Sequence, residues 1–408
     1  MGNTTSRRPP ARGTSPPAES TAVAVLVVAY MAYGAFWGAW VVVFADFLRE
    51  RDFTAGSVSL LFAVMSVIAI SVMAFVAPRL EAASRHVTLT LALVVHAAGN
   101  AAVALVANEW LWAAFLLMGA GTGLIDVFVN AAGQEIEARS NRSVLQWVHA
   151  AYGAGGVVGA LGTAVAVTNG VGYRGAIVAA ALLQMVVAFF CWGSSGLRVT
   201  STRSAGRFSL AVFFSQRGLT KPAIIVLFSF FIEGSMDVWS VIFLRETLGS
   251  SILGGAMAFA AFALAITLGR TLAASFFFRL GYAKTVLASG IGSLAFATVA
   301  VLSPSAVLAG VAFLGLGFML SPAAPAAFGM AEGAGGRAGL AVGAITTVGY
   351  TGFVVGPPIM GWLADNVGLR AAMSALLVAT LGMAITGLAV RTSRRTDSAE
   401  SALLSRSD

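Results

Sequence analysis

The stretch GLIDVFVNAAGQEIE, residues 123–137, places a carboxylate inside one of the most apolar parts of the chain. At about 100° per residue on a helix, Asp126 and Asn130 fall on one stripe with Gly123. A carboxylate inside a bilayer is unfavourable unless it faces a wet cavity or a partner. We therefore predict that Asp126 lines a transport path and carries protons, and that Asn130 binds the substrate. The alternative is that Asp126 hydrogen-bonds to His149 or Asn130 and only joins two helices.

His149 lies in the next apolar segment, with Gln146 three residues before it. Histidine gains or loses a proton readily near neutral pH, so we predict that His149 takes part in proton coupling with Asp126 and that Gln146 binds substrate. A histidine that only bridges or caps helices is the alternative. Gly153 and Gly156 continue the same face and predict a helix that packs tightly and slides.

Two acids, Glu233 and Asp237, stand one helical turn apart in another apolar segment, and Ser240 continues their face. Two ionised carboxylates at this spacing repel each other, so at least one of them should be protonated or paired. We predict a proton-coupling role for both acids and a substrate contact for Ser240. Arg270 is a candidate counter-ion, unless its long side chain reaches to the membrane interface instead.

Aromatic and proline residues give two further predictions. Tyr33, Trp37 and Trp239 offer ring faces on which the apolar C–H face of a sugar could stack, although aromatic residues in membrane helices also form lipid-facing belts. Prolines remove backbone hydrogen bonds and kink helices. Such kinks suit helices that must bend during transport, and the alternative is a static kink. The four prolines in question are Pro322, Pro325, Pro357 and Pro358.

The segments that carry these residues are long and apolar. The chain of 408 residues is 58% hydrophobic and 10% charged, with a mean hydropathy of +0.87, so it belongs to the class of membrane proteins. A spanning helix needs about 20 apolar residues. Twelve runs are long enough, at approximately 21–44, 57–77, 87–107, 110–132, 145–167, 173–194, 222–244, 253–277, 284–302, 306–329, 339–362 and 369–390.

The net charge of +8 reflects topology rather than a nucleic-acid partner. If both termini are cytoplasmic, most basic residues fall in cytoplasmic segments, as the positive-inside rule requires. Only five arginines would then lie outside: Arg49, Arg51, Arg174, Arg245 and Arg370.

The chain also divides into two similar halves. VGYRGAI at 171–177 matches VGLRAAM at 367–373, and Tyr152 corresponds to Tyr350 in the same order, which indicates a duplicated six-helix unit. We predict an all-α integral membrane protein of twelve transmembrane helices in two six-helix pseudo-repeats around a central cavity. Its parts are a disordered cytoplasmic tail (1–20), an N-terminal half (21–194), a cytoplasmic linker (195–221), a C-terminal half (222–390) and a cytoplasmic tail (391–408).

Twelve spans, a central loop and two repeats resemble the major facilitator superfamily of secondary transporters. Five segments are similar to its branch of sugar, polyol and rhizopine transporters, and more distantly to fucose permeases: GLIDVFVNAAGQEIE, LQWVHAAYGAGGVVGALG, FFIEGSMDVWSVIFLRETLG, FALAITLGR and TTVGYTGFVVGPPIMGWLADNVGLR. In the fucose-permease-like pattern a carboxylate is followed four residues later by Asn, which DVFVN matches. The superfamily's loop signature between spans two and three survives only as APRLEAASRHV, without its aspartate, so the latch that it supplies is in doubt in the first half.

Function follows from these features. No zinc cluster, phosphate-binding loop or nucleophile motif is present, so we expect no enzymatic activity, no cofactor and no metal. We predict proton-coupled alternating access for a small polar solute such as a sugar, cyclitol or polyol; the alternative is proton-driven efflux of lipophilic drugs or secondary metabolites. The expected partners are the solute, protons and the lipid bilayer. The composition is typical of a high-GC bacterium, so we expect the bacterial cytoplasmic (inner) membrane. The resemblance to the superfamily implies a monomer.

Overall fold

The computed structural model describes residues 16–80, 82–140, 143–198, 218–332 and 338–404, and within these ranges every regular element is helical. The first half contains α1 (Pro16–Arg51), α2 (Ala55–Ser71), α3 (Arg85–Leu105), α4 (Leu111–Ser140), α5 (Val144–Thr168) and α6 (Tyr173–Gly193). The second half contains α8 (Thr220–Ile242), α9 (Ile252–Leu280), α10 (Tyr282–Leu302), α11 (Ala306–Leu320), α12 (Ala323–Glu332), α13 (Ala338–Val367), α14 (Leu369–Met373) and α15 (Ala375–Leu404). Short helical turns join some of them: η1 (Val72–Val76), η2 (Ala77–Leu80), η3 (Asn108–Trp110), η4 (Ser195–Leu197) and η5 (Phe243–Thr247).

The predicted set of twelve spans is confirmed, because twelve helical stretches of the described residues are long and apolar enough to cross a membrane. Several helices run past the apolar run that predicted them. In α4, for example, the helix continues to Ser140, beyond the apolar limit at residue 132, because the polar residues that follow are still compatible with helical geometry. Such helices are therefore longer than the apolar runs from which they were predicted.

The predicted tails and linker fall partly outside the described residues, namely at 1–15, 199–217 and 405–408. Of the described parts, α1 already begins at Pro16, and α15 continues to Leu404 as one helix past the predicted boundary at residue 390.

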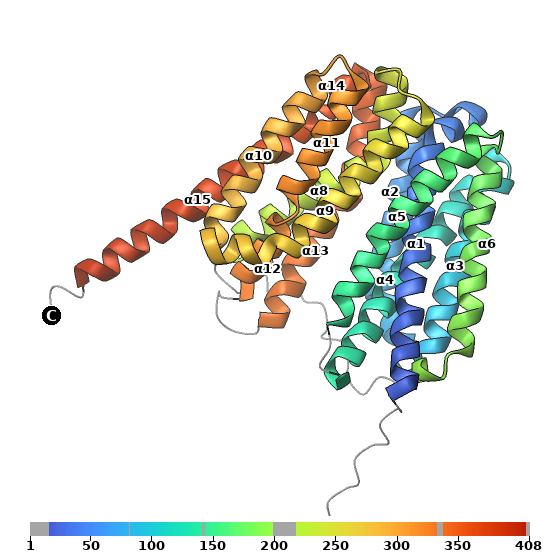
Figure 1. The fold of residues 1–408 in the computed structure, drawn as a ribbon, viewed down its shortest axis with the longest axis horizontal. Helices are drawn as coiled ribbons and strands as arrows, with labels where there is room; N and C mark the ends of the chain where they lie inside the picture. The colour runs from blue at the N-terminus through green and yellow to red at the C-terminus, as the bar shows by residue number, and fades with distance from the viewer. Residues whose placement is uncertain (1–15, 81, 141–142, 199–217, 333–337, 405–408) are drawn as a thin grey trace, which may run out of the picture.

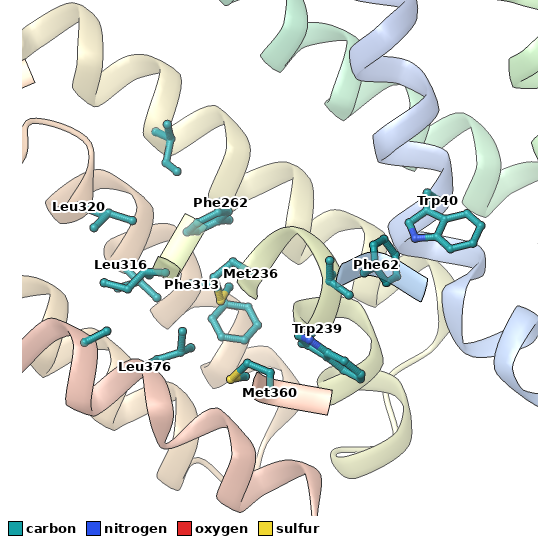
Figure 2. Packing of buried hydrophobic residues seen from close by; sticks show 14 of the residues in the cluster. Trp40, Phe62, Met236, Trp239, Phe262, Phe313, Leu316, Leu320, Met360 and Leu376 are labelled. Carbon is teal, nitrogen blue, oxygen red and sulfur yellow. The ribbon is translucent and has the colours of Figure 1, made fainter. Parts of the chain in front are cut away.

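Figure 1 shows the two halves as separate bundles that lie side by side, the first in blue to green and the second in yellow to red. They approach each other at the end of the molecule that carries α14. At this end the aromatic core is continuous between the halves: the ring of Phe44 on α1 lies 5.6 Å from that of Trp239 on α8. Figure 2 shows Trp40 and Phe62 of the first half on one side of this region, with Trp239 and Met360 of the second half on the other.

Glycines set the tight packing of α5 on α1, and the predicted Gly156 is at this contact: a Cβ atom on Gly38 of α1 would meet the main-chain oxygen of Gly156. A Cβ atom on Gly155 or Gly159 would collide with main-chain atoms of α1, so these two residues allow the close approach. Gly153 lies against Thr267 of α9, in the second half, and Gly156 lies between Gly34 of α1 and Phe259 of α9. Gly155 and Gly159 therefore extend the predicted packing face toward α1, and Gly153 belongs to the contact between the halves.

The prolines interrupt one helix and not the other. The tenth span is divided into α11 and α12 at Ser321 and Pro322, which are buried. The eleventh span, α13, remains one helix through Pro357 and Pro358. A proline at the first residues of a new helix leaves no hydrogen bond unmade, which explains why the break is at Pro322.

Candidate functional site

A cavity of about 580 Å³ lies between the two halves. Its wall is built by α1, α2, α4 and α5 of the first half and by α8, α9, α12 and α13 of the second. Lining residues Gln146, His149 and Thr271 are exposed to solvent, so the cavity opens toward the end of the molecule at which α1 and α5 begin. We call this the open end (Met73, Gln146, Thr271 and Phe328) and the other the closed end (Asp46, Thr54, Arg245 and Asp365).

Asp126 lines the cavity from α4, near the middle of the span. Its Oδ1 accepts a hydrogen bond of 3.2 Å from the hydroxyl of Tyr30 on α1. The alternative required a hydrogen bond from this carboxylate to His149 or Asn130, and the structure shows neither. Asn130 donates instead to the main-chain oxygen of Asp126, at 2.7 Å, within the same helix. The carboxyl group is thus held by one tyrosine and faces the cavity.

His149 lines the cavity from α5, together with Gln146. Its Nε2 lies 3.0 Å from Oδ1 of Asn130, and the ring of Tyr30 packs edge-on against its own at 5.3 Å. Asn130 is not among the residues that line the cavity, so its expected contact with substrate is corrected: its side chain contacts His149 instead. Among the described residues no hydrogen bond joins His149 directly to Asp126, and proton coupling between them stays a prediction.

The second half contributes a pair of acids with one cation. Glu233 accepts two hydrogen bonds from Nη2 of Arg270, at 2.9 and 2.7 Å, and both side chains line the cavity. Asp237, one turn further along α8, also lines the cavity, and no cation of the described residues is within ion-pair distance of it. Arg270 therefore lies where a counter-ion to one acid was expected, and Asp237 is left to water or a ligand.

Two of the predicted aromatic residues line the cavity, and a third does not. Tyr33 and Trp37 face it from α1. Trp239 is fully buried outside the wall, where its Nε1 donates to the main-chain oxygen of Pro357 at 3.1 Å, and Ser240 is fully buried as well. The expectation that Trp239 and Ser240 bind substrate is corrected. Both lie further along α8 than Asp237, at the level where the halves are already in contact.

Sequence reasoning missed a cluster of tyrosines. Tyr30, Tyr152 and Tyr350 all line the cavity, and the ring of Tyr152 lies 5.2 Å from Tyr30 and 5.6 Å from Tyr33. Two signals were available. Tyr30 precedes Tyr33 by three residues and extends the aromatic stripe of the first helix, and Tyr152 and Tyr350 are equivalent positions of the internal repeat.

The predicted gating residues are divided between the wall and the packing around it. Pro325 on α12 and Pro357 on α13 line the cavity, whereas Pro322 and Pro358 do not. Gly153 lies beside the cavity residue Thr267, whose Oγ1 a Cβ atom on that glycine would meet at 2.6 Å. The two prolines of the cavity wall, as far as it is described, thus both come from the second half.

Comparison with known proteins agrees with this architecture. The family model of the Major Facilitator Superfamily matches residues 23–352. An uncharacterized MFS-type transporter of Yersinia pestis is 31% identical over 282 residues, which cover 68% of this chain and 71% of that protein. The membrane protein MosC of Rhizobium meliloti is 27% identical over 278 residues, which cover 66% of this chain and 65% of MosC.

Solved structures with the same fold are much more distant in sequence. A bacterial homologue of the human lysosomal transporter Spinster, in an inward-facing and unoccupied conformation, has a TM-score of 0.76 at 15% identity, over 93% of this chain and 98% of that one. The nucleoside transporter NupG has a TM-score of 0.73 at 13% identity, over 91% and 98%. Because the family model covers most of the chain and the helices repeat its architecture, the chain belongs to the Major Facilitator Superfamily of secondary membrane transporters.

Proposed function

We propose that this transporter moves a small polar solute, such as a sugar, cyclitol or polyol, together with protons by alternating access. The observation that carries the proposal is the cavity between the halves, which has Asp126, His149, Glu233 and Asp237 in its wall and exposed lining residues at the open end. A site reached from one side at a time, between two pseudo-repeats, is what alternating access requires.

The proposed orientation places the open end and both termini in the cytoplasm of a bacterium, with the cavity facing inward. Arg139, Arg279 and Lys284 lie at helix ends on this side. The closed end also carries arginines, but Arg51 and Arg370 are bound to main-chain oxygens of their own half, with Nη1 2.6 Å from Val106 and 2.5 Å from Val301. These two arginines bind main-chain oxygens at the ends of helices, which gives them a structural role at the closed end. Their presence there therefore agrees with a positive-inside orientation in which the open end is cytoplasmic.

Asp126 is the proposed proton carrier. Its carboxyl group has one hydrogen-bond donor, Tyr30, and no cation of the described residues is paired with it. Glu233, by contrast, is already neutralised by Arg270. A carboxyl group that faces a water-filled cavity without a fixed counter-ion can take up a proton at one side and release it at the other.

The proposed solute is bound by hydrogen-bonding groups that converge on the cavity from both halves. Gln146, His149 and Asp237 offer donors and acceptors, and the tyrosine hydroxyls add more. Tyr33 and Trp37 supply ring faces for the C–H surface of a sugar or cyclitol. The volume of about 580 Å³ lies within the range of small-molecule sites.

Efflux of lipophilic compounds is the second candidate, because about half of the lining residues are apolar. They come mainly from α2, α8, α12 and α13, and include Phe62, Met65, Met73, Phe230, Phe328 and Phe353. An apolar wall of this kind favours a ligand with apolar surface.

Internal pH in proteoliposomes tests the proposal. The wild type, Asp126→Asn and the control Glu109→Gln, an exposed acid away from the cavity, are compared while sugars, cyclitols and then lipophilic cations are added outside. We expect solute-dependent proton influx with a sugar or cyclitol, lost in Asp126→Asn while solute exchange at equilibrium persists. Proton movement with lipophilic compounds only would favour efflux, and none with any compound would contradict proton coupling.

A further inference from the structure

The hydrogen bonds between side chains and the other half of the molecule gather at the closed end, within the described residues. Oδ2 of Asp365, near the end of α13, accepts hydrogen bonds from Oγ1 of Thr54 at 2.7 Å and from the main-chain N of Gly56 at 2.8 Å. Thr54 and Gly56 stand at the start of α2, in the first half of the chain. One carboxylate of the second half is therefore bound to the N-terminus of a helix in the first.

The position of Asp365 is electrostatically favourable. Thr54 is the N-cap residue of α2, and its side chain also accepts a hydrogen bond of 3.2 Å from the main-chain N of Ser57. The first turn of a helix has main-chain N–H groups without helical partners and a partial positive charge, which a carboxylate stabilises. Asp365 thus completes the cap of a helix that belongs to the other half.

Glycines let the two helices approach at this point. A Cβ atom on Gly56 would meet Oδ2 of Asp365. On the other helix, a Cβ atom on Gly361 would meet Oγ of Ser59 and, at 2.5 Å, the main-chain oxygen of Ala55. A larger residue at position 361 would push α13 away from the main chain of α2, whereas a larger residue at position 56 would displace the carboxylate of Asp365.

An ion pair makes a second connection at the same end. Arg245, in the turn that follows α8, donates from Nη1 to Oδ2 of Asp46 at 2.9 Å and from Nη2 to Oδ1 at 3.1 Å. The same Nη1 lies 2.9 Å from the main-chain oxygen of Val42 on α1. The arginine side chain is 8% exposed and that of Asp46 18%, so the bidentate pair is largely shielded from solvent.

Several charged groups toward the open end are paired within their own half. Arg85 binds Glu135 at 2.6 Å inside the first half, and Arg270 binds Glu233 inside the second. Glu137 accepts a hydrogen bond of 2.9 Å from the main-chain N of Leu145, also in the first half. These groups are not available for a connection between the halves unless they first lose a partner.

We propose that the cap of Asp365 on α2 and the Asp46–Arg245 pair form a latch that holds the closed end shut, so that the transporter rests with its cavity open at the other end. The inference rests on the alternating access proposed above, but not on which solute is carried. Opening the closed end must break both the Asp365 cap and the Asp46–Arg245 pair. The groups named at the open end already have partners, so they form no new interaction that offsets the lost interaction energy. Solute binding must supply the difference.

Cysteine accessibility in the full-length protein tests the latch without any solute. Cys191 is buried and is replaced by Ala, and single cysteines are placed at Ala45 or Ala150. Ala45 lines a small cavity of about 260 Å³ at the closed end, whereas Ala150 lines the central cavity. In membranes, a water-soluble maleimide should label position 150 readily and position 45 slowly.

Asp365→Asn and Arg245→Gln should each raise the labelling rate at position 45 by about five-fold or more and lower it at position 150. Glu109→Gln, an exposed acid at the closed end without a contact to the other half, should change neither. Gly56→Ala replaces Asp365→Asn in the test if that variant does not fold, because the added methyl group displaces the carboxylate of Asp365 while Asp365 keeps its charge. Unchanged labelling at both positions in the latch variants overturns the inference, whether or not a transported solute has been found.

Discussion

The hydroxyl of Tyr30 on α1 donates a hydrogen bond to Oδ1 of Asp126 on α4, and this is the single side-chain donor that the described residues supply to that carboxylate. The bond joins two helices of the first half across the wall of the cavity. It also makes the proposed proton carrier depend on a residue from another helix.

Tyr30→Phe should therefore impair coupled transport while the fold is retained. The substitution keeps the ring, which packs against Tyr33 and Tyr152, and removes only the donor. A hydrogen bond to a charged group contributes about 1.5–3 kcal/mol, so we expect coupled uptake to fall by about ten-fold or more. Uptake and solute counterflow are measured in the same proteoliposomes. Equal loss of both activities would assign the bond a structural role instead.

Arg270→Gln should lower both stability and transport, because it leaves Glu233 and Asp237 one turn apart without a cation. The Arg270–Glu233 ion pair is partly exposed, so the loss in stability should be about 1 kcal/mol or less. In the double variant Arg270→Gln with Glu233→Gln, the melting temperature should return toward that of the wild type. A double variant that is less stable than Arg270→Gln alone would argue against repulsion between the acids.

Trp37 and Trp239 should respond differently to substitution, although both are tryptophans of equivalent halves. Trp37→Ala removes a ring from the cavity wall and should raise the KM for solute severalfold. Trp239 lies outside the cavity wall, and Trp239→Phe removes its hydrogen bond to the main-chain oxygen of Pro357, so it should change the rate of transport more than the KM. Initial rates over a range of solute concentrations separate the two. A larger change in KM for Trp239→Phe would restore it as a binding residue.

Gly155→Ala and Gly162→Ala form a matched pair on α5. At Gly155 the added methyl group would collide with the main chain of α1, whereas nothing lies within 4 Å of a Cβ atom at Gly162. We expect Gly155→Ala to destabilise the protein by about 1–3 kcal/mol. Gly162→Ala should be neutral or stabilising by up to about 1 kcal/mol, since alanine favours the helix. Thermal unfolding in detergent gives both values, and similar melting temperatures for the two variants would exclude the close packing described here.

Much of the fold could be predicted from the sequence because the bilayer imposes simple rules. Apolar runs of spanning length, the repeat of VGYRGAI by VGLRAAM and the resemblance of the motifs predicted twelve helices in two halves, and the structure and the family match agree. The acids of the site were also found from sequence, since a carboxylate such as Asp126 inside an apolar run is unfavourable unless it faces a cavity or a partner. The spans and the acids within them can be predicted because each depends on the residue types along a single segment of the chain.

Only the tertiary structure decided which of these residues meet. Helical periodicity put Trp239 and Ser240 near Asp237 on the seventh span, but both are fully buried outside the cavity wall. It likewise could not show that Tyr30 holds Asp126, that Asn130 turns to His149, or that Asp365 caps α2. The physical reason is that a sequence specifies the face of each helix through local spacing, whereas the partner of that face depends on how the helices tilt and which end of the molecule is closed.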